Sequence, residues 1–181
     1  MLKYSSIARR YALRKKSDYA NTQSGMMIIE AMVAILLLML GMLGIAGLTA
    51  KSTTMAGQAQ YRTEAGMYAD QIIQMINLGV SRTSETELAA SLQAFQHQAS
   101  GGDTDACVFS GAATSDTGLA DVLKAAQGQL NGVAGLPGAT AQGQQVRIET
   151  TDNLNQVTVT LCWQGPGDAA KRNYQIQAFV H

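Results

Sequence analysis

Charged residues, cysteines, histidines and tryptophan are scarce in this chain of 181 residues. Only 14% of the residues are charged, and there are two cysteines, two histidines and one tryptophan. These cysteines and histidines lack the closely spaced pairs that zinc sites use. The sequence also has no P-loop, no G-x-S-x-G motif and no H-E-x-x-H motif. We therefore expect no enzyme, no metal, no cofactor and no small-molecule substrate.

Acidic residues are almost missing from the start of the chain. Six basic residues precede Gly25, where Asp18 is the only acid. Seven basic and twelve acidic residues follow Gly25, which gives the rest of the chain a net charge of −5. This asymmetry is typical of a targeting or membrane-facing segment. The mildly acidic remainder argues against nucleic-acid binding, which needs clustered Lys and Arg.

Polar side chains are absent from the 18 residues Ala31–Leu48. As a helix this run is about 27 Å long, close to the hydrocarbon thickness of a bilayer. Residues 26–29 extend it, and Glu30 interrupts it. Basic residues before the run and none within it predict an N-terminus in the cytoplasm. We therefore expect a single-pass membrane protein, with the remainder of the chain across the membrane.

The pattern along the chain predicts three parts: a leader at residues 1–25, a transmembrane helix at 26–50 and a globular domain at 51–181. One long helix should run from Met26 to about Ile76 and stop near Gly79, apolar all round at first and amphipathic later. Its expected inward positions are Met55, Ala59, Ala65, Tyr68, Ala69, Ile72, Ile73 and Ile76.

Two short helices and three strands are expected after the long helix. Ser84 and Glu87 have capping-box spacing and begin a helix to about Gln98, with His97 on its polar side. Asp116 or Thr117 caps another helix, whose inward residues are Leu119, Val122, Leu123, Ala126 and Leu130. Alternation of apolar and polar residues then predicts an antiparallel meander over 146–148, 157–163 and 174–180. The predicted fold class is α+β, with this sheet packed on the second half of the long helix.

Two features leave alternatives open. Gly41, Gly44 and Gly47 lie near one face of the apolar helix, and either allow close helix packing or mark a stretch that unwinds. Cys107 and Cys162, in an exported domain, form a disulfide or remain as two buried thiols.

The segment Ser24–Glu30 reads Ser-Gly-Met-Met-Ile-Ile-Glu, between a basic leader and an apolar helix. It resembles the class III signal of type IV prepilins. The resemblance implies that a prepilin peptidase cuts between Gly25 and Met26 and that the new Met26 amine is N-methylated. It also implies that Glu30 pairs with the Met26 amine of a neighbouring subunit and so sets the register of the assembly.

Ile29–Leu48 resembles the helix of PilV-type minor pilins in particular, with its glycine-rich end. Leu136-Pro137-Gly138 and the Val-Thr-Val-x-x-x-Trp pattern of Val157–Trp163 are similar to the C-terminal part of these proteins. The resemblance implies a type IV pilin-like fold and a structural or priming role in pilus assembly, with other minor and major pilins as partners. It also implies an anchor in the inner membrane and a globular domain in the periplasm, before the subunit joins the tip or base of a pilus. A minor pseudopilin of a type II secretion system, or a signal-anchored periplasmic binding protein or enzyme, are the alternatives.

Overall fold

The computed structural model describes residues 24–101, 104, 106–130, 132–151 and 154–181. Of the expected leader, residues 1–23 lie outside this description. The chain divides into two compact units that meet between Lys51 and Ser52. The long helix α1 (Ser24–Gly79) contributes to both units.

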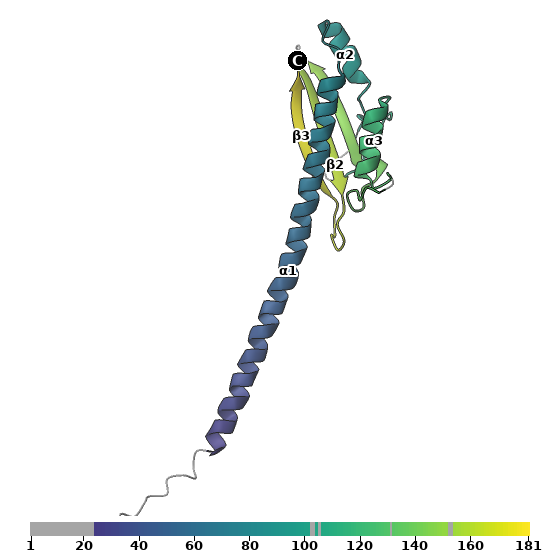
Figure 1. The fold of residues 1–181 in the computed structure, drawn as a ribbon. Coiled ribbons are helices and arrows are strands. Elements are labelled where there is room, and N and C mark those ends of the chain that lie inside the picture. Colours follow the sequence, from purple (N-terminus) through teal and green to yellow (C-terminus); the bar gives the residue numbers. More distant parts are fainter. Residues whose placement is uncertain (1–23, 102–103, 105, 131, 152–153) are drawn as a thin grey trace, which may run out of the picture. The chain divides into compact units, whose positions relative to one another are not determined.

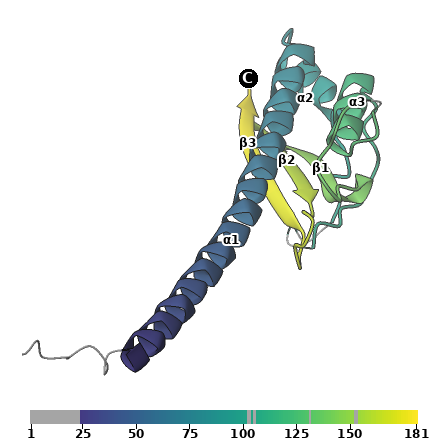
Figure 2. The same ribbon diagram turned by 60° about the horizontal axis from the view of Figure 1, so that its bottom comes forward.

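The second unit combines helices with one antiparallel sheet (Figures 1 and 2). Its strands are β1 (Gln144–Thr151), β2 (Leu154–Trp163) and β3 (Arg172–Val180), and they lie in the order β1-β2-β3. Both neighbouring pairs are antiparallel, so the predicted meander is confirmed. The helices beside it are α2 (Glu85–Gln93) and α3 (Thr117–Ala126), and a short 3-10 helix (Ala141–Gly143) precedes β1. The α+β prediction, with a long helix packed on a small sheet, is also confirmed.

One apolar core joins the second half of α1 to the sheet. Ala65, Ala69, Ile72 and Ile76 have no exposed surface and recur at helical spacing along the side of α1 that faces the sheet. The apolar row of β2 that completes this core is equally buried and consists of Val157, Val159 and Leu161. Burial of each valine, leucine or isoleucine side chain in this core stabilises the folded unit by roughly 1.5–3 kcal/mol.

Two of the inward positions predicted for α1, Met55 and Ala59, were wrong. Met55 is 57% exposed and Ala59 is also exposed, whereas Tyr61 is the first residue of α1 to pack against the core. The helical period continues through residues 55–59, but the sheet-facing core does not extend that far along α1. Periodicity therefore identified the correct side of the helix and not the point where packing begins.

The expected helix starts are confirmed by their caps. The Ser84 hydroxyl accepts a hydrogen bond from the N–H of Glu87 (3.2 Å), and an Asp116 carboxylate oxygen accepts one from the N–H of Leu119 (2.7 Å). Both contacts satisfy backbone donors that the first turn of a helix leaves free.

The expected extent of the α2 helix was wrong, because α2 ends at Gln93 and not near Gln98. Beyond it the chain turns to pair with the sheet. The N–H of His97 donates to the carbonyl of Val146, and the N–H of Val146 donates to the carbonyl of His97, both at 2.9 Å. His97 is consequently buried and not on the polar side of a helix. Leu130 was also expected inward, but α3 stops at Ala126 and Leu130 is 37% exposed.

Candidate functional site

The first half of α1 presents apolar side chains on every side. From Met26 to Leu48, all of its large apolar side chains are at least half exposed, with Met26 at 74% and Leu48 at 71%. Among the described residues, this is the one helix long and apolar enough to cross a membrane. An apolar surface of this extent needs a partner of low polarity, such as lipid tails or other helices. This fits the predicted transmembrane helix.

Glu30 is the only charged residue between Met26 and Ala50. Ser24 is the first residue of α1, so Glu30 lies in the second helical turn, and its side chain is exposed among apolar neighbours. The junction Gly25–Met26 lies one turn before it, within the same helix. An amine created at Met26 would therefore lie on the same side of the helix as the Glu30 carboxylate.

The three glycines of the apolar half lie inside continuous α-helix. A side chain built at Gly41, Gly44 or Gly47 would meet no described atom within 4 Å. No other described part of this chain therefore packs closely against them. Each glycine still weakens the helix by up to about 1 kcal/mol relative to alanine.

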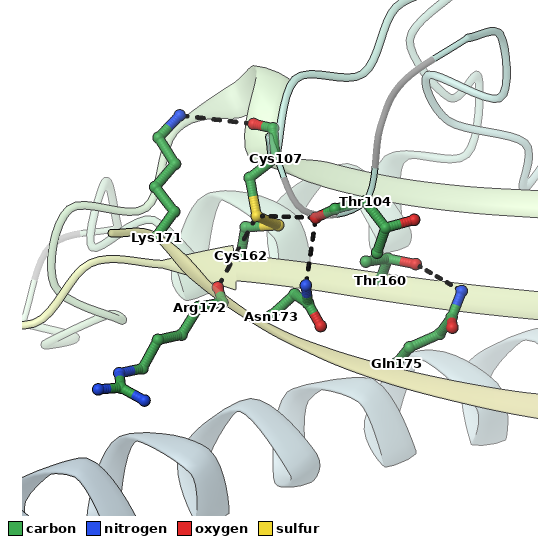
Figure 3. The surroundings of a disulfide bond; sticks show 8 residues. All are labelled: Thr104, Cys107, Thr160, Cys162, Lys171, Arg172, Asn173 and Gln175. Carbon is green, nitrogen blue, oxygen red and sulfur yellow. Dashed lines mark hydrogen bonds between the residues drawn. A yellow bond between two sulfur atoms is a disulfide. The ribbon is translucent and has the colours of Figure 1, made fainter. Parts of the chain in front are cut away.

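Cys107 and Cys162 form a disulfide, with a Cα–Cα distance of 5.9 Å (Figure 3). Cys162 lies near the end of β2, on the sheet face opposite α1, and both cysteines are buried beside Phe109. The bond fastens the loop before α3 onto that face. Further contacts hold the same loop: the Lys171 ammonium donates to the carbonyl of Cys107 (3.5 Å), and the Asn173 amide donates to the carbonyl of Thr104 (3.2 Å). Of the two alternatives left open for these cysteines, the disulfide is the one present.

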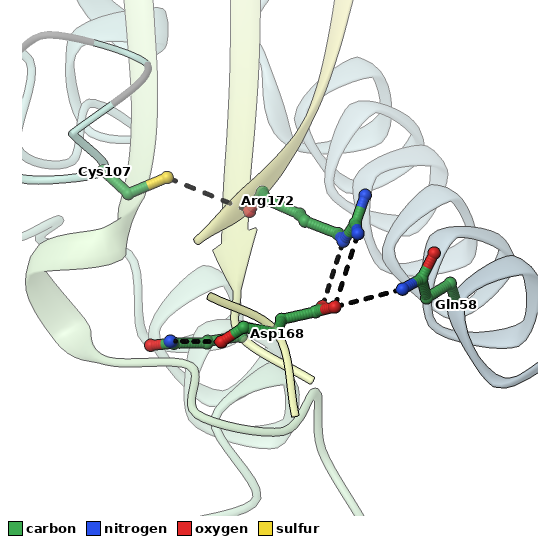
Figure 4. A network of polar contacts seen from close by, with 5 residues as sticks. Gln58, Cys107, Asp168 and Arg172 are labelled. Carbon is green, nitrogen blue, oxygen red and sulfur yellow. Dashed lines mark hydrogen bonds and ion pairs between the residues drawn. The ribbon is translucent and has the colours of Figure 1, made fainter. Parts of the chain in front are cut away.

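A polar contact that the sequence did not reveal links α1 to the loop between β2 and β3 (Figure 4). The Arg172 guanidinium donates two hydrogen bonds to the Asp168 carboxylate, at 3.0 and 3.3 Å, and the Gln58 amide donates a third at 3.0 Å. The Arg172 contacts hold the pKa of the Asp168 carboxyl below its ordinary value, and the Gln58 bond acts in the same direction. Because Gln58 and Asp168 are 110 residues apart, no local pattern could have paired them.

His97 is the one buried histidine of the described chain. Its Nδ1 atom accepts a hydrogen bond from the N–H of Thr114 (3.2 Å), so the neutral ring carries its proton on Nε2. Burial lowers the pKa of His97 from its ordinary 6.5. The ring thereby connects the loop after α2 to the loop before α3.

No group of three or more potential metal ligands is present among the described residues. Comparison with protein families, with curated proteins and with solved structures finds no match for this chain. The most distinctive features of the described residues are the exposed apolar half of α1 and its single carboxylate, Glu30.

Proposed function

We propose that this chain is a minor pilin that takes part in the assembly or initiation of a type IV pilus. The observation that carries the proposal is an exposed apolar helix of membrane-spanning length with one carboxylate, Glu30, one turn after the Gly25–Met26 junction. In this proposal prepilin peptidase cuts at that junction and Met26 is N-methylated. The chain has a structural role and catalyses no reaction.

The membrane is the first environment of the helix in this proposal. Its apolar surface suits the hydrocarbon core of the inner membrane, where the helical backbone satisfies its own hydrogen bonds. Basic residues before Gly25 favour retention of the N-terminus in the cytoplasm. The disulfide between Cys107 and Cys162 suits a body in the oxidising periplasm.

The second environment is a bundle of helices from other minor and major pilins. A carboxylate in low dielectric costs several kcal/mol unless it has a partner, and the helix itself supplies no cation between Met26 and Ala50. Cleavage before Met26 creates a positive amine. Pairing of Glu30 with this amine on a neighbouring subunit neutralises charges of both chains, and a slipped helix loses this contact between subunits. The pair therefore selects one axial register.

Replacement of Glu30 by Gln tests this role, because it removes the charge and keeps the size of the side chain. Loss of one partner of a desolvated ion pair costs roughly 3–5 kcal/mol. We expect normal membrane insertion and normal cleavage, with the variant missing from pili sheared off the cells. The matched control is Asp70→Asn, which removes one charge from the exposed side of the same helix. Pili that contain the Glu30→Gln variant at the level of the control would refute the pairing.

Deletion of the chain tests the assembly to which it belongs. We expect loss of pili and of twitching motility. Loss of exoprotein secretion with normal pili would instead assign the same role to a type II secretion pseudopilus.

A further inference from the structure

The two edge strands of the sheet, β1 and β3, differ in what pairs with their outer sides. At β1, the backbone of His97 pairs with Val146, so part of this edge is closed by the chain itself. At β3, no described strand pairs with the outer side (Figure 2). One row of β3 backbone donors and acceptors therefore faces outward, in the arrangement that a further strand recognises.

The β3 edge lacks the usual protection against strand pairing. Exposed edges in natural proteins generally carry charged residues, proline or a bulge. From Asn173 to Val180 the strand has no charged residue, no proline and no glycine, and its register with β2 is unbroken. The charge at its start, Arg172, is engaged with Asp168.

The apolar side of β3 is covered only in part. Of its four apolar residues on the α1 side, Val180 is buried and the other three are half-buried, whereas the β2 residue opposite each of these three has no exposed surface. These pairs, with the β3 residue first, are Tyr174–Leu161, Ile176–Val159 and Ala178–Val157. A strand beside β3 would complete the cover on this side, as β3 completes it for β2. On the other side it would meet the exposed amides of Gln175 and Gln177.

We propose that the outer edge of β3 binds an extended segment of another protein subunit, which adds a strand to the sheet. The segment is uncharged and alternates apolar residues, on the α1 side, with uncharged polar residues. A second copy of β3 fits less well, because antiparallel self-pairing would make the two Ser52–Gly79 segments of α1 run in opposite directions. Two copies inserted in one membrane by residues 26–48 start from the same side. The inference goes beyond the proposed function and does not depend on cleavage at Gly25.

A peptide probe with the pattern of β3 itself, Asn-Tyr-Gln-Ile-Gln-Ala-Phe-Val, tests the edge directly. It carries a fluorescent label and solubilising lysines outside the eight residues, and it is titrated into the full-length chain in detergent micelles. We expect saturable binding, and weaker binding by a peptide of scrambled order. No saturation up to about 1 mM would overturn the proposal.

Two N-methylated peptides distinguish strand pairing from nonspecific hydrophobic binding. One is methylated at the odd backbone amides and the other at the even ones, so their compositions match. Because alternate N–H groups of a strand point to opposite sides, only one of the two should lose binding. Equal binding by both, or loss by both, would contradict strand addition.

Variants of the chain locate the binding site. Ile176→Lys places a charge in the half-covered row of the edge, and we expect it to weaken peptide binding about tenfold. The matched control Thr158→Lys adds the same charge to the central strand and should bind normally. The native fluorescence of Trp163 verifies that both variants are folded. Equal binding by the two variants would exclude this edge, and sedimentation of the peptide-free chain as a dimer that Ile176→Lys abolishes would assign the edge to a second copy.

Discussion

Removal of the Cys107–Cys162 disulfide should strongly destabilise the second unit of this protein. The bond joins residues 55 apart in the sequence and fastens the loop before α3 to β2. Without it, the unfolded chain regains the freedom of a long open loop, while the folded unit keeps its sheet and its α1 core. The effect therefore appears mainly as a gain in the entropy of the unfolded state.

The chain-entropy relation gives the size of this effect. For a separation of 55 residues it predicts about 4 kcal/mol at room temperature. Domains of this kind are stable by roughly 5–15 kcal/mol in total. The double variant Cys107→Ala/Cys162→Ala should thus lose a large share of its stability, and it leaves no unpaired thiol to form wrong disulfides.

Urea unfolding of the full-length chain in detergent micelles measures this loss. Trp163 is the only tryptophan and is 2% exposed, so its fluorescence reports unfolding of this core. We expect the free energy of unfolding to fall by about 4 kcal/mol and the slope with urea to rise, because the open chain exposes more surface. Reduction of the unmodified protein should reproduce both changes. A loss below about 1 kcal/mol would refute the reasoning, since the unfolded chain would then be restricted even without the bond.

Other consequences concern the core and pH. Ile72 has no exposed surface, so Ile72→Ala should cost about 2–5 kcal/mol in the same unfolding assay, whereas Leu78→Ala, at an 87% exposed position of α1, should cost far less. An equal cost at the two positions would contradict the packing of α1. The pKa of His97 is lowered on folding, so the unfolded chain binds the proton more readily. The contribution of His97 to stability should therefore be constant well above pH 6.5 and fall as the pH decreases through that value, with a slope of at most about 1.4 kcal/mol per pH unit. His97→Asn should lack this pH dependence, and an unchanged dependence in that variant would locate its origin elsewhere.

Local sequence patterns predicted the elements of this fold well. The period of two over residues 157–163 and 174–180 became β2 and β3, and Ser84 and Asp116 cap α2 and α3 as expected. These signals depend on neighbours along the chain. The errors occurred where tertiary contacts decide: residues 94–98 leave the helix because His97 pairs with β1, and Met55 is exposed because the core starts further along α1.

The features of the candidate site likewise fall into those that the sequence predicted and those that depend on tertiary contacts. Glu30 and the apolar run after it are visible in the sequence alone, because a lone charge beside such a run is unusual. The contact of Gln58 with Asp168 and the half-covered edge of β3 depend on which segments meet in space. No spacing rule connects residues so far apart in sequence.

The most direct test of the central claim is the N-terminus of the protein isolated from its own membranes. Intact-mass analysis and N-terminal sequencing should find a chain that begins at Met26, with one added methyl group on its amine. Such a chain has the amine that Glu30 is proposed to meet. A chain that begins at Met1 would contradict the account, because no such amine would exist beside the apolar helix.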